Sequence, residues 1–452
     1  MANNFLPSLA LVSALAFVPA ASAALAPVDV NSYRELDQFM TVLDQVKANY
    51  VDRVDDQTLI RGAIDGMLAS LDPHSSYMDA REYRNLMTTT DGNYGGLGLT
   101  VTMDDGAVKV MAATRGTPAD RAGIKPGDFI THIDGQLFYG GTLDEAVDRM
   151  RGNPGTSVRL TIVRPGRERP FDVNITRAII DIPAVTSSVR DGVGILTVNT
   201  FSRVTTEGTQ RAIADIRRQL GHDPSGWVLD LRSNPGGLLD QAVSLSDLFL
   251  DNGEIVSQRG RRPTDIERYY AHPGDATNGA PIIVLVDAGT ASAAEIVAGA
   301  LQDHRRALVM GERSFGKGSV QTLIPLGDGT TALRLTTARY YTPSGRSVQE
   351  GGIAPDVPVP QLSDPDYRSR TSVRESDLRR HLINESGIRD DVLQSDDRPD
   401  PRFAATAEQL RERHVDDYQL DYAVRTLARL APQAARPAQT AAAAAAPRGG
   451  RH

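Results

Sequence analysis

Ser292 stands in a segment whose residue types could stabilise the transition state of an acyl transfer. The segment, Asp287–Ile296, follows the apolar run Pro281–Val286 and opens an alanine-rich stretch that is typical of a helix. A serine at the N-terminus of a helix places its Oγ and the next backbone N–H at the positive end of the helix dipole, where an oxyanion would be stabilised. Ser292 is therefore a candidate nucleophile. The alternative is that Ser292 only caps the helix, which the small residues around it would also explain.

Lys317 is the candidate base for such a serine. It lies between Gly316 and Gly318, and glycines let the backbone approach another part of the chain closely, so that the lysine side chain can turn inward. Burial can lower the pKa of a lysine from about 10.4 toward about 7–8, where the neutral amine accepts a proton. Gln321 follows four residues later, on the same face of a strand or a helix, and could orient the amine. The alternative is a solvated lysine in a glycine-rich loop.

A third segment could supply a second donor to the oxyanion. Leu229–Gly237 begins in a predicted strand and continues past its C-terminal end, and the sites of open α/β sheets gather at that end. Gly236 and Gly237 can each offer a backbone N–H that no side chain obstructs. The alternative is an ordinary turn from a strand to a helix, since two consecutive glycines alone are a weak signal.

The sequence disfavours other catalytic arrangements. It contains neither G-x-S-x-G nor H-E-x-x-H, and its eight histidines are scattered, so we predict no Ser-His-Asp triad and no metal site. Ser314 and Lys317 match the S-x-x-K pattern of penicillin-binding proteins, but that pattern needs a helix, which Gly316 and Gly318 oppose. We therefore reject Ser314 as the nucleophile, and we expect no cofactor.

The composition excludes further classes of protein. The chain has 452 residues with 49 Lys+Arg and 57 Asp+Glu, a net charge of −8, and its 40% hydrophobic and 23% charged residues are ordinary for a soluble globular protein. Its length suits about three domains. The acidic balance argues against a nucleic-acid partner. The absence of cysteine excludes disulfides, cysteine-based zinc sites and a cysteine nucleophile.

The two ends of the sequence have the composition of segments outside a packed core. Leu9–Ala20 is a short apolar run that precedes Ala21-Ser22-Ala23, an A-x-A cleavage pattern, although no Lys or Arg precedes the run. We predict a signal peptide over residues 1–23, and hence export as a soluble protein to the periplasm or another extracytoplasmic space. Residues 431–452 are rich in Ala, Pro and Arg, which predicts a disordered tail.

Between these ends the patterns predict an α/β multidomain protein. Residues 30–91 have apolar residues at helical spacing and form a predicted helical N-terminal region. Residues 92–178 are short β-branched runs between glycines and prolines, with one helix at 143–150, and predict a small β-rich module. Residues 185–360 alternate strands and helices, which predicts a largely parallel sheet with packed helices. Residues 365–430 are polar with helical stretches.

The third of these regions is the most regular. We expect strands at 195–201, 227–231, 281–286 and 307–310. We expect helices at 205–220, 238–250 and 291–301.

The catalytic candidates, taken together, resemble the signature sequences of the carboxyl-terminal processing peptidases, which are the tail-specific serine proteases of peptidase family S41. The segments that carry this resemblance are Thr290–Glu295, Gly316–Gln321 and Asp230–Gly237. Other segments are similar to the family's N-terminal signature, Leu71–Tyr77 and Tyr94–Gly98, and to its PDZ signature, Thr117–Asp128. The resemblance covers about residues 33–360.

This resemblance implies a Ser/Lys dyad on a crotonase/ClpP-like sheet with packed helices. Ser292 would be the nucleophile, Lys317 the general base, and Gln321 the residue that orients Lys317. The oxyanion donors that it implies are the backbone N–H groups of Ala293 and of Gly236 or Gly237. Asp303 matches an acidic position proposed for the sites of some members, and a structural role at the end of a helix is its alternative.

The resemblance also implies that residues 92–178 are a PDZ domain. PDZ domains bind an extended C-terminal peptide as an added strand, and a glycine-containing loop captures the terminal carboxylate. The residues that match this loop are Gly95, Gly96, Leu97 and Gly98. Arg151 would couple the position of the PDZ domain to the active site, and a surface arginine in a turn is the alternative.

Two hypotheses of different classes follow. The first is an exported serine endopeptidase that cuts protein substrates near their C-termini. The second is a catalytically inactive scaffold whose PDZ domain binds peptides. The partners that we expect are proteins or peptides with free C-termini. The sequence leaves open a homo-oligomer through the N-terminal helices, an adaptor protein, and whether the PDZ domain inhibits or recruits.

Overall fold

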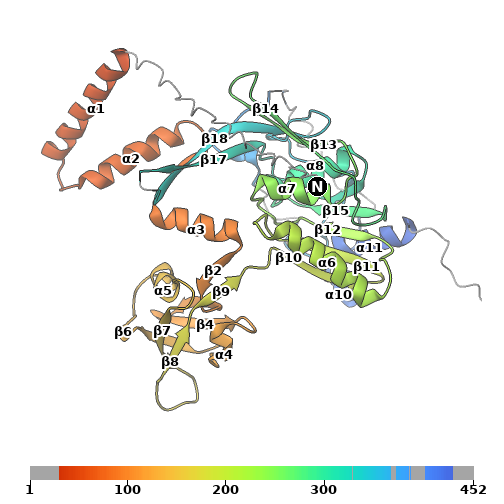
Figure 1. Cartoon of the computed structure of the whole chain (residues 1–452), viewed down its shortest axis with the longest axis horizontal. Coiled ribbons are helices and arrows are strands. Elements are labelled where there is room, and N and C mark those ends of the chain that lie inside the picture. Colours follow the sequence, from red (N-terminus) through yellow and green to blue (C-terminus); the bar gives the residue numbers. More distant parts are fainter. Residues whose placement is uncertain (1–29, 328, 368–372, 386, 388–402, 431–452) are drawn as a thin grey trace, which may run out of the picture. The chain divides into compact units, whose positions relative to one another are not determined.

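The computed structural model (Figure 1) describes residues 30–327, 329–367, 373–385, 387 and 403–430. The predicted signal peptide, residues 1–23, and the predicted tail, residues 431–452, lie outside the described residues. The chain divides into two compact units, with the boundary after Gly66. No helix among the described residues has both the length and the apolar character to cross a membrane.

Two helices form the described part of the first unit. α1 is Val30–Asn49, and α2, Asp56–Ala69, continues past the boundary of the unit. Lys47 near the end of α1 forms an ion pair with Asp56 at the start of α2, with 2.8 Å between Nζ and Oδ1. Large apolar side chains of α1 are exposed, namely Tyr33, Leu36, Phe39, Met40 and Val42. An exposed apolar surface of this kind is typical of a protein–protein contact.

The second unit begins with a short connection to the β-rich module. α3 (Ala80–Asp91) is capped by Asp79, whose side chain accepts from the N–H of Glu82, and Gly92 ends it in the left-handed conformation. β2 (Asn93–Gly96) then pairs antiparallel with β9 (Ala178–Asp181). This two-stranded ribbon carries the chain into the β-rich module and out of it.

The β-rich module is a six-stranded antiparallel sheet with two helices. Its order is β3-β4-β5-β7-β8, with β6 paired to β5. The elements are β3 (Leu99–Asp104), β4 (Ala107–Ala113), α4 (Pro118–Arg121), β5 (Phe129–Ile133), β6 (Gln136–Leu137), α5 (Leu143–Met150), β7 (Ser157–Val163) and β8 (Phe171–Thr176). Alternate residues are buried in a single core, as in β7, where Val158, Leu160 and Ile162 are buried. The predicted β-rich module and its helix at 143–150 are confirmed, whereas the short helix α4 is not predicted from the sequence.

A second six-stranded sheet forms the centre of the unit. Its order is β10-β11-β12-β15-β16-β19, antiparallel only between β10 and β11. The strands are β10 (Val185–Arg190), β11 (Val193–Val198), β12 (Trp227–Asp230), β15 (Ile282–Val286), β16 (Ala307–Gly311) and β19 (Val357–Pro358). Every residue of β12 and β15 is buried, as expected for parallel strands that are covered on both faces.

Helices cover both faces of this central sheet (Figure 1). α6 (Thr205–Leu220), α7 (Leu239–Asp247) and α8 (Ala293–Asp303) pack on one face, where Val284 and Val286 point. Residues 403–430 pack on the other face, against Ile283 and Leu285, and include α10 (Ala407–Glu412) and α11 (Tyr418–Leu430). The predicted β/α alternation is confirmed, and α6 has the bounds that we expect from the sequence.

A separate antiparallel sheet of five strands, which the sequence patterns do not predict, stands beside the central sheet (Figure 1). The strands are β1 (Ser76–Met78), β13 (Glu254–Gly260), β14 (Ile266–Tyr270), β17 (Ser319–Leu326) and β18 (Thr331–Tyr341). β18 pairs with β17 along its length, with β1 near its start and with β13 near its end. A single 3₁₀ turn, η1 (Glu375–Asp377), follows later in the chain. Lys317 lies directly before β17, so this sheet positions the candidate base.

Candidate active site

Ser292 lies between β15 and α8 with an unusual backbone conformation. Its φ of 56° and ψ of −117° place a non-glycine residue in the region that glycine favours. Such a conformation costs about 1–3 kcal/mol and persists only where the surroundings enforce it, which is frequent at functional sites. The residue that follows, Ala293, begins α8. The prediction that Ser292 stands at the N-terminus of a helix is confirmed.

Glu295 is completely buried and joins the two candidate catalytic segments. Its Oε2 accepts the backbone N–H of Ser292 at 2.7 Å and that of Lys317 at 2.9 Å. Its Oε1 accepts the Ser314 hydroxyl at 2.6 Å and the Gly316 N–H at 2.7 Å. The backbone nitrogens of Ser292 and Lys317 are therefore bound to one and the same oxygen atom.

The ionisation of Glu295 is balanced between opposing effects. Complete burial raises its pKa to about 7, while the hydroxyl of Ser314 and the three backbone N–H groups oppose this shift. Because Ser314 Oγ accepts from the N–H of Ile353 at 2.6 Å, its own proton points at Glu295. A proton on either oxygen would face a donor, so only the carboxylate form can accept all four hydrogen bonds at once.

The segment around Lys317 is held by close backbone contacts. A Cβ on Gly316 would lie 2.6 Å from the carbonyl oxygen of Glu350, and one on Gly318 would lie 2.5 Å from the backbone nitrogen of Gln349. The buried hydroxyl of Tyr340 donates to the carbonyl of Lys317. The glycines on both sides of Lys317 are therefore required by packing, as the sequence suggests.

The amine of Lys317 is in an environment that favours its neutral form. Burial and the neighbouring charge of Arg334 lower its pKa below 10.5, whereas the charges of Glu375, Glu295 and Asp72 act in the opposite direction. A lowered pKa increases the fraction of neutral amine at a given pH, and only the neutral amine can accept a proton. Lys317 therefore has the electrostatic character of a general base.

Gln321 lies near this cluster but does not bind Lys317. Its Nε2 donates to Ser319 Oγ at 2.9 Å and to Thr336 Oγ1 at 3.3 Å. Thr336 Oγ1 in turn donates to Asp72 Oδ1 at 3.1 Å. A β-bulge between Val320 and Gln321 shifts the register of β17 here. Gln321 thus belongs to a polar network that links β17, β18 and the segment before β1.

The oxyanion loop, which we define as Leu231–Gly237, passes directly beside Ser292. A Cβ on Gly236 would lie 2.7 Å from Ser292 Cβ and 3.0 Å from the Ala293 nitrogen. The Gly236 N–H donates to Asn234 Oδ1 at 2.8 Å, so it is occupied within the loop. Among the described residues, the N–H groups of Ala293 and Gly237 donate to no protein acceptor outside a helix or strand. The pair Ala293 and Gly237 therefore fits the oxyanion role better than Ala293 and Gly236.

The side chains of Ser292 and Lys317 do not form a hydrogen bond with each other within the described structure. The hydroxyl of Ser292 instead lies beside that of Tyr340, whose pKa is raised well above 10 mainly by burial. Catalytic hydrogen bonds are often long before substrate binds, and they shorten in the productive complex. Glu295 thus fixes the backbone of Ser292 and of Lys317, whereas a hydrogen bond between their side chains would form only when substrate binds.

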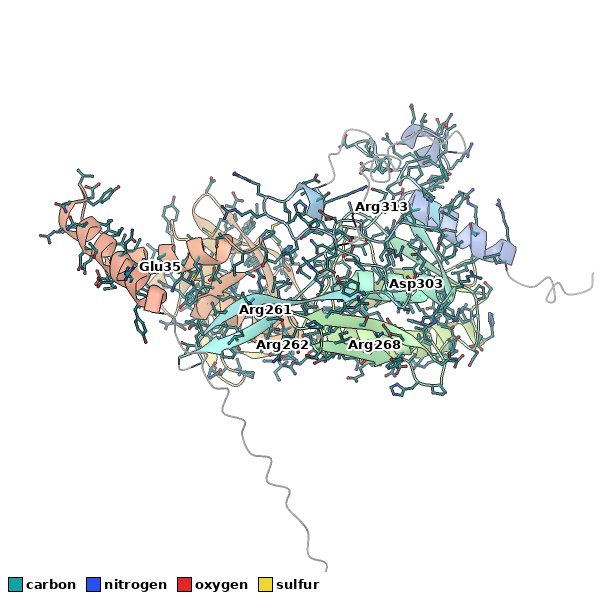
Figure 2. The ribbon with its side chains drawn as sticks, turned by 90° about the horizontal axis from the view of Figure 1, so that it is seen from above. Glu35, Arg261, Arg262, Arg268, Asp303 and Arg313 are labelled. Carbon is teal, nitrogen blue, oxygen red and sulfur yellow. The ribbon has the colours of Figure 1, made fainter. Side chains whose placement is uncertain are left out.

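Two further candidates from the sequence have structural roles. Residues 313–318 are not helical, so Ser314 and Lys317 do not form an S-x-x-K pair. Asp303, labelled in Figure 2, lies at the C-terminal end of α8 and accepts the N–H of Ser344 at 3.0 Å. Arg313, also labelled there, is buried and donates to the carbonyl of Gly351 at 2.9 Å, which anchors the segment that carries Lys317.

The glycine segment of the β-rich module connects β2 with β3. Gly95 and Gly96 belong to β2, Leu97 is buried in the core of the module, and Gly98 has a φ of 78°. A Cβ on Gly95 would lie 2.1 Å from the carbonyl oxygen of Gly152. This close approach gives a structural reason for Gly95 besides ligand binding. β3, which follows, lies at the end of the strand order, with one side unpaired in the described sheet, and α5 packs beside it.

Arg151 lies at the C-terminal end of α5 and connects this module to α3. Its Nη1 donates to Asn85 Oδ1 at 3.2 Å, and its guanidinium lies over the ring of Tyr94 at 4.7 Å. Its Nε is buried without a hydrogen-bond partner. In this structure Arg151 therefore contacts the connection between the module and the rest of the chain, and not the residues around Ser292.

Sequence reasoning missed the residues that hold the site together. Glu295 has a local signal, because it occupies the third position of the helix that Ser292 precedes, where a carboxylate reaches back to free N–H groups. Tyr340, Thr336 and Asp72 have no local signal. They come close to Lys317 or Gln321 only because β1, β17 and β18 pair in one sheet.

Family models match three parts of the chain. A model of peptidase family S41 matches residues 192–359, and a PDZ-domain model matches residues 109–164. A model of the N-terminal domain of the activating protease CtpB matches residues 20–82.

Curated relatives match most of the chain. The carboxy-terminal-processing protease of Bartonella bacilliformis is 52% identical over 354 residues, which are 78% of this chain and 81% of that protein. The carboxy-terminal processing protease CtpB of Bacillus subtilis is 34% identical over 355 residues, or 77% of this chain and 72% of that protein. A carboxyl-terminal-processing protease of Synechocystis is 39% identical over 307 residues, or 66% of this chain and 70% of that protein.

Proposed function

Because the chain belongs to the carboxy-terminal processing serine proteases of peptidase family S41, we propose that it is an exported endopeptidase that cuts polypeptides near their C-termini through a Ser292/Lys317 dyad. The observation that carries this proposal is the single buried carboxylate of Glu295, which binds the backbone N–H groups of both residues. A chain that used Ser292 only as a helix cap would have no need to attach the lysine segment to it.

The proposed reaction follows from the arrangement of these groups. The neutral amine of Lys317 takes the proton of Ser292 Oγ, and Oγ attacks the carbonyl carbon of the scissile peptide bond. The N–H groups of Ala293 and Gly237 stabilise the negative charge on the carbonyl oxygen. The ammonium of Lys317 then gives its proton to the leaving amine, and the peptide C–N bond breaks. A water molecule, deprotonated by Lys317, hydrolyses the acyl-enzyme and restores the serine.

The test is a set of three variants, each assayed for peptide cleavage with its folding checked by circular dichroism. We expect Ser292→Ala and Lys317→Ala each to lose at least about a thousandfold in kcat, since neither member of a dyad works alone. Gln321→Ala should lose less, because the structure gives it only indirect contact with Lys317. Near-full turnover by Lys317→Ala at neutral pH would refute the dyad.

The competing hypothesis is a catalytically inactive PDZ scaffold. The missing hydrogen bond between Ser292 and Lys317 is compatible with it, but a lysine with a lowered pKa is not needed by a scaffold. An active-site serine probe separates the two. Labelling of the natural chain that disappears in Ser292→Ala supports the protease, and no labelling of either supports the scaffold.

We further propose that the PDZ domain, for which we keep the bounds 92–178, binds the free C-terminus of the substrate. The peptide would add to the unpaired side of β3, beside α5, with its carboxylate at Gly95–Gly98. The position of β3 at the end of the sheet supports this mode of binding. We keep Arg151 as the residue that couples the domain to the site, and its contacts with Asn85 and Tyr94 at the connection support that role.

The assembly and location of the protein remain proposals as well. The exposed apolar side chains of α1 support a homo-oligomer through the N-terminal helices. The masses of the natural chain and of a Leu36→Asp variant, measured by analytical ultracentrifugation, test this. If both chains sediment with the mass of a monomer, the homo-oligomer is refuted. Residues 1–23 support export to the periplasm, which N-terminal sequencing of the mature protein tests. An adaptor protein would be identified by crosslinking in cells.

A further inference from the structure

Arg232 connects the oxyanion loop to the C-terminal part of the chain. It is the second residue of the loop, and its side chain is only 14% exposed. It pairs with Asp230, which ends β12, and with Asp417, which lies 185 residues later in the sequence. The C-terminal segment thus reaches the edge of the sheet at which Ser292 lies.

All five N–H groups of the Arg232 guanidinium are used. Nε and Nη2 donate to Asp230 at 2.9 and 2.6 Å. Nη1 and Nη2 donate to Asp417 at 2.9 and 2.7 Å, and Nη1 also donates to Gln419 Oε1 at 3.0 Å. A guanidinium held by two bidentate carboxylates has a fixed plane and position. Arg232 therefore cannot move without breaking several charge-assisted hydrogen bonds.

Asp417 is itself held in place. Its Oδ1 accepts the N–H of Leu420 at 3.1 Å, which makes it the N-cap of α11, and it also accepts Gln361 Nε2 at 2.8 Å. α11 packs by its apolar face on the central sheet, where Ala423, Val424 and Leu427 are buried. The carboxylate that binds Arg232 is therefore fixed to the sheet by a whole helix.

The loop that Arg232 enters has a strained turn. Ser233, the next residue, has a φ of 55°, a conformation that must be enforced by its surroundings. On one side Asp287 Oδ1 accepts the Ser233 N–H at 2.8 Å, and Asn234 accepts the Ala291 N–H at its carbonyl at 2.9 Å. On the other side the loop is held by the ion pairs of Arg232 with Asp230 and Asp417. Both sides together hold Gly236 against Ser292, with Gly237 next to it in the chain.

We propose that Asp417 is a positioning residue for the oxyanion hole, acting through Arg232 to hold the loop at the distance at which the Gly237 N–H reaches the developing charge. This rests on the proposed function. It assigns a role to the C-terminal segment, which lies beyond the part of the chain that the S41 family model matches. Without Asp417, Arg232 keeps Asp230 and its single hydrogen bond to Gln419, but it loses the bidentate ion pair that attaches it firmly to α11.

The test is Asp417→Asn, because asparagine caps a helix as well as aspartate does. The change keeps the cap of α11 and the size of the side chain, and it removes the charge that binds Arg232. Removing an oxyanion donor outright costs about 10²–10³ in kcat, so a displaced donor should cost about tenfold in kcat. KM should change by less than about twofold. A peptide aldehyde, which forms a tetrahedral adduct with Ser292, should bind more weakly by the same factor as kcat/KM.

The matched control is Asp421→Asn. Asp421 lies on α11 and accepts Arg190 Nη2 at 3.1 Å, so it also attaches the helix to the central sheet, but it does not touch Arg232. The control makes the same chemical change on the same helix and should keep the natural kcat. Equal loss of kcat in both variants would mean that the helix acts only through stability, and would overturn the proposal.

A double-mutant cycle with Arg232→Lys tests the route through the arginine. Lysine keeps the charge but loses the bidentate contacts, so Asp417→Asn should cost little further kcat in that background. Full additivity of the two losses in kcat would overturn the proposal. If Asp417→Asn does not fold, Asp417→Ser, which also caps a helix but has no carboxylate, is assayed instead, and a natural kcat in that variant counts against the proposal.

The failure of this inference is distinguishable from that of the proposed function. If the natural chain cleaves peptides and Ser292→Ala does not, the function stands whatever Asp417→Asn does. If Ser292→Ala still cleaves peptides, Ser292 is not the nucleophile. The proposed function and the oxyanion role of the loop then fail together, and the kcat of Asp417→Asn no longer reports on an oxyanion hole beside Ser292.

Discussion

Glu295 is the residue on which the geometry of the proposed dyad depends. Its two oxygens accept from four donors on two segments of chain, including the backbone of Ser292 and Lys317. Charge-assisted hydrogen bonds of this kind are stronger than neutral ones, and leaving buried donors unpaired costs about 1–3 kcal/mol each. The nucleophile and the base are therefore positioned by a residue that takes part in no proton transfer.

We expect Glu295→Gln to lose at least about a hundredfold in kcat/KM. The glutamine amide would place an NH₂ group against N–H donors, so at least two hydrogen bonds are lost and the backbone of Ser292 and Lys317 separates. The control is Asp303→Asn at the other end of α8, which should keep its activity because Asp303 binds Ser344 and Arg346 rather than Ser292 or Lys317. Cleavage kinetics and thermal midpoints of both variants check this. Activity near the natural level in Glu295→Gln would show that catalysis does not need the four hydrogen bonds of Glu295.

The pH profile of cleavage should rise from acid to alkaline in two steps. The lower step belongs to Glu295, whose pKa is about 7 and whose carboxylate is the form that accepts all four donors. The upper step belongs to Lys317, whose pKa is lowered from 10.5 by burial, so the neutral base forms below that pH. Rates in kcat/KM from pH 5 to 10.5 measure both. A single rise centred near pH 10.5 would mean that Lys317 is solvated.

The pH dependence of stability that arises from Glu295 should run opposite to that of the activity. The pKa of Glu295 in the folded chain is raised above the ordinary 4.5, so the folded state holds this proton more tightly than the unfolded state does. The contribution of Glu295 to stability is therefore present below about pH 4.5 and is lost as the pH rises through about 7. The thermal midpoint of the natural chain, compared with that of Glu295→Gln over this range, isolates the contribution. A constant difference between the two would contradict it.

At the level of single residues, the sequence indicates the candidate catalytic residues more readily than the residues that hold them in place. Ser292 and Lys317 stand in motifs with local spacing, and the structure attaches both to one carboxylate. Only the structure distinguishes Gly236 from Gly237 as a candidate oxyanion donor, because the conformation of the loop decides that the Gly236 N–H binds Asn234. Gln321 illustrates the limit, since the β-bulge before it decides where its side chain points.

At the level of elements, the oxyanion loop approaches the start of α8 closely. This approach requires Gly236, whose φ is 96° and whose absent side chain would meet Ser292 and the carbonyl of Ala291 at less than 3 Å. The loop that follows β12 and the helix that follows β15 thus meet without an intervening side chain.

We expect Gly236→Ala to lose activity almost completely and to be destabilised by more than its backbone strain. The control is Gly345→Ala, because Gly345 also has a positive φ, of 81°, but its Cβ would meet nothing within 4 Å. Both variants carry the strain of a left-handed alanine, about 1–2 kcal/mol, and only Gly236→Ala separates the loop from Ser292. Thermal midpoints and kcat of the two variants measure the difference. Equal effects would show that strain alone acts at Gly236.

The elements that the sequence predicts are those with local periodicity. The strands and helices of the central sheet alternate within short stretches, and α6 follows its apolar spacing from Thr205 to Leu220. The antiparallel sheet is different, because β1 pairs with β18 across more than half of the chain. Strands such as β14, Ile266–Tyr270, are mostly exposed and lack alternation. Pairing over such distances leaves no signal within a sequence window.

At the level of the whole molecule, the proposed role of the PDZ domain depends on the charge of the substrate's end. Amidating the C-terminus of a peptide removes that charge without changing its other contacts. We expect the amidated peptide to be cleaved at least about tenfold more slowly, as kcat/KM, than the free acid. Equal cleavage of the two peptides by the natural chain would refute the proposal that the PDZ domain binds the terminal carboxylate, and it would not affect the proposed dyad.

The same pair of peptides tests Arg151. If Arg151 couples the domain to the site, Arg151→Ala should reduce the discrimination between free acid and amide, because its contacts to Asn85 and Tyr94 join the module to α3. Arg149→Ala is the control, since Arg149 lies two residues earlier on α5 and contacts only Gln136 and Phe138 within the module. Unchanged discrimination in Arg151→Ala would assign it to packing alone.

The contact between Arg232 and Asp417 has a consequence for the order of events during synthesis. The ribosome completes Ser292, Lys317 and the oxyanion loop about a hundred residues before it adds Asp417, and domains fold as they emerge, at about 5–20 residues per second. Until α11 docks, the loop lacks the attachment that runs through Asp417. On the proposed role of Asp417, a nascent or truncated chain therefore carries the candidate catalytic side chains before its oxyanion loop is fully held, and its turnover should stay about tenfold below that of the complete chain until the last described helix is in place.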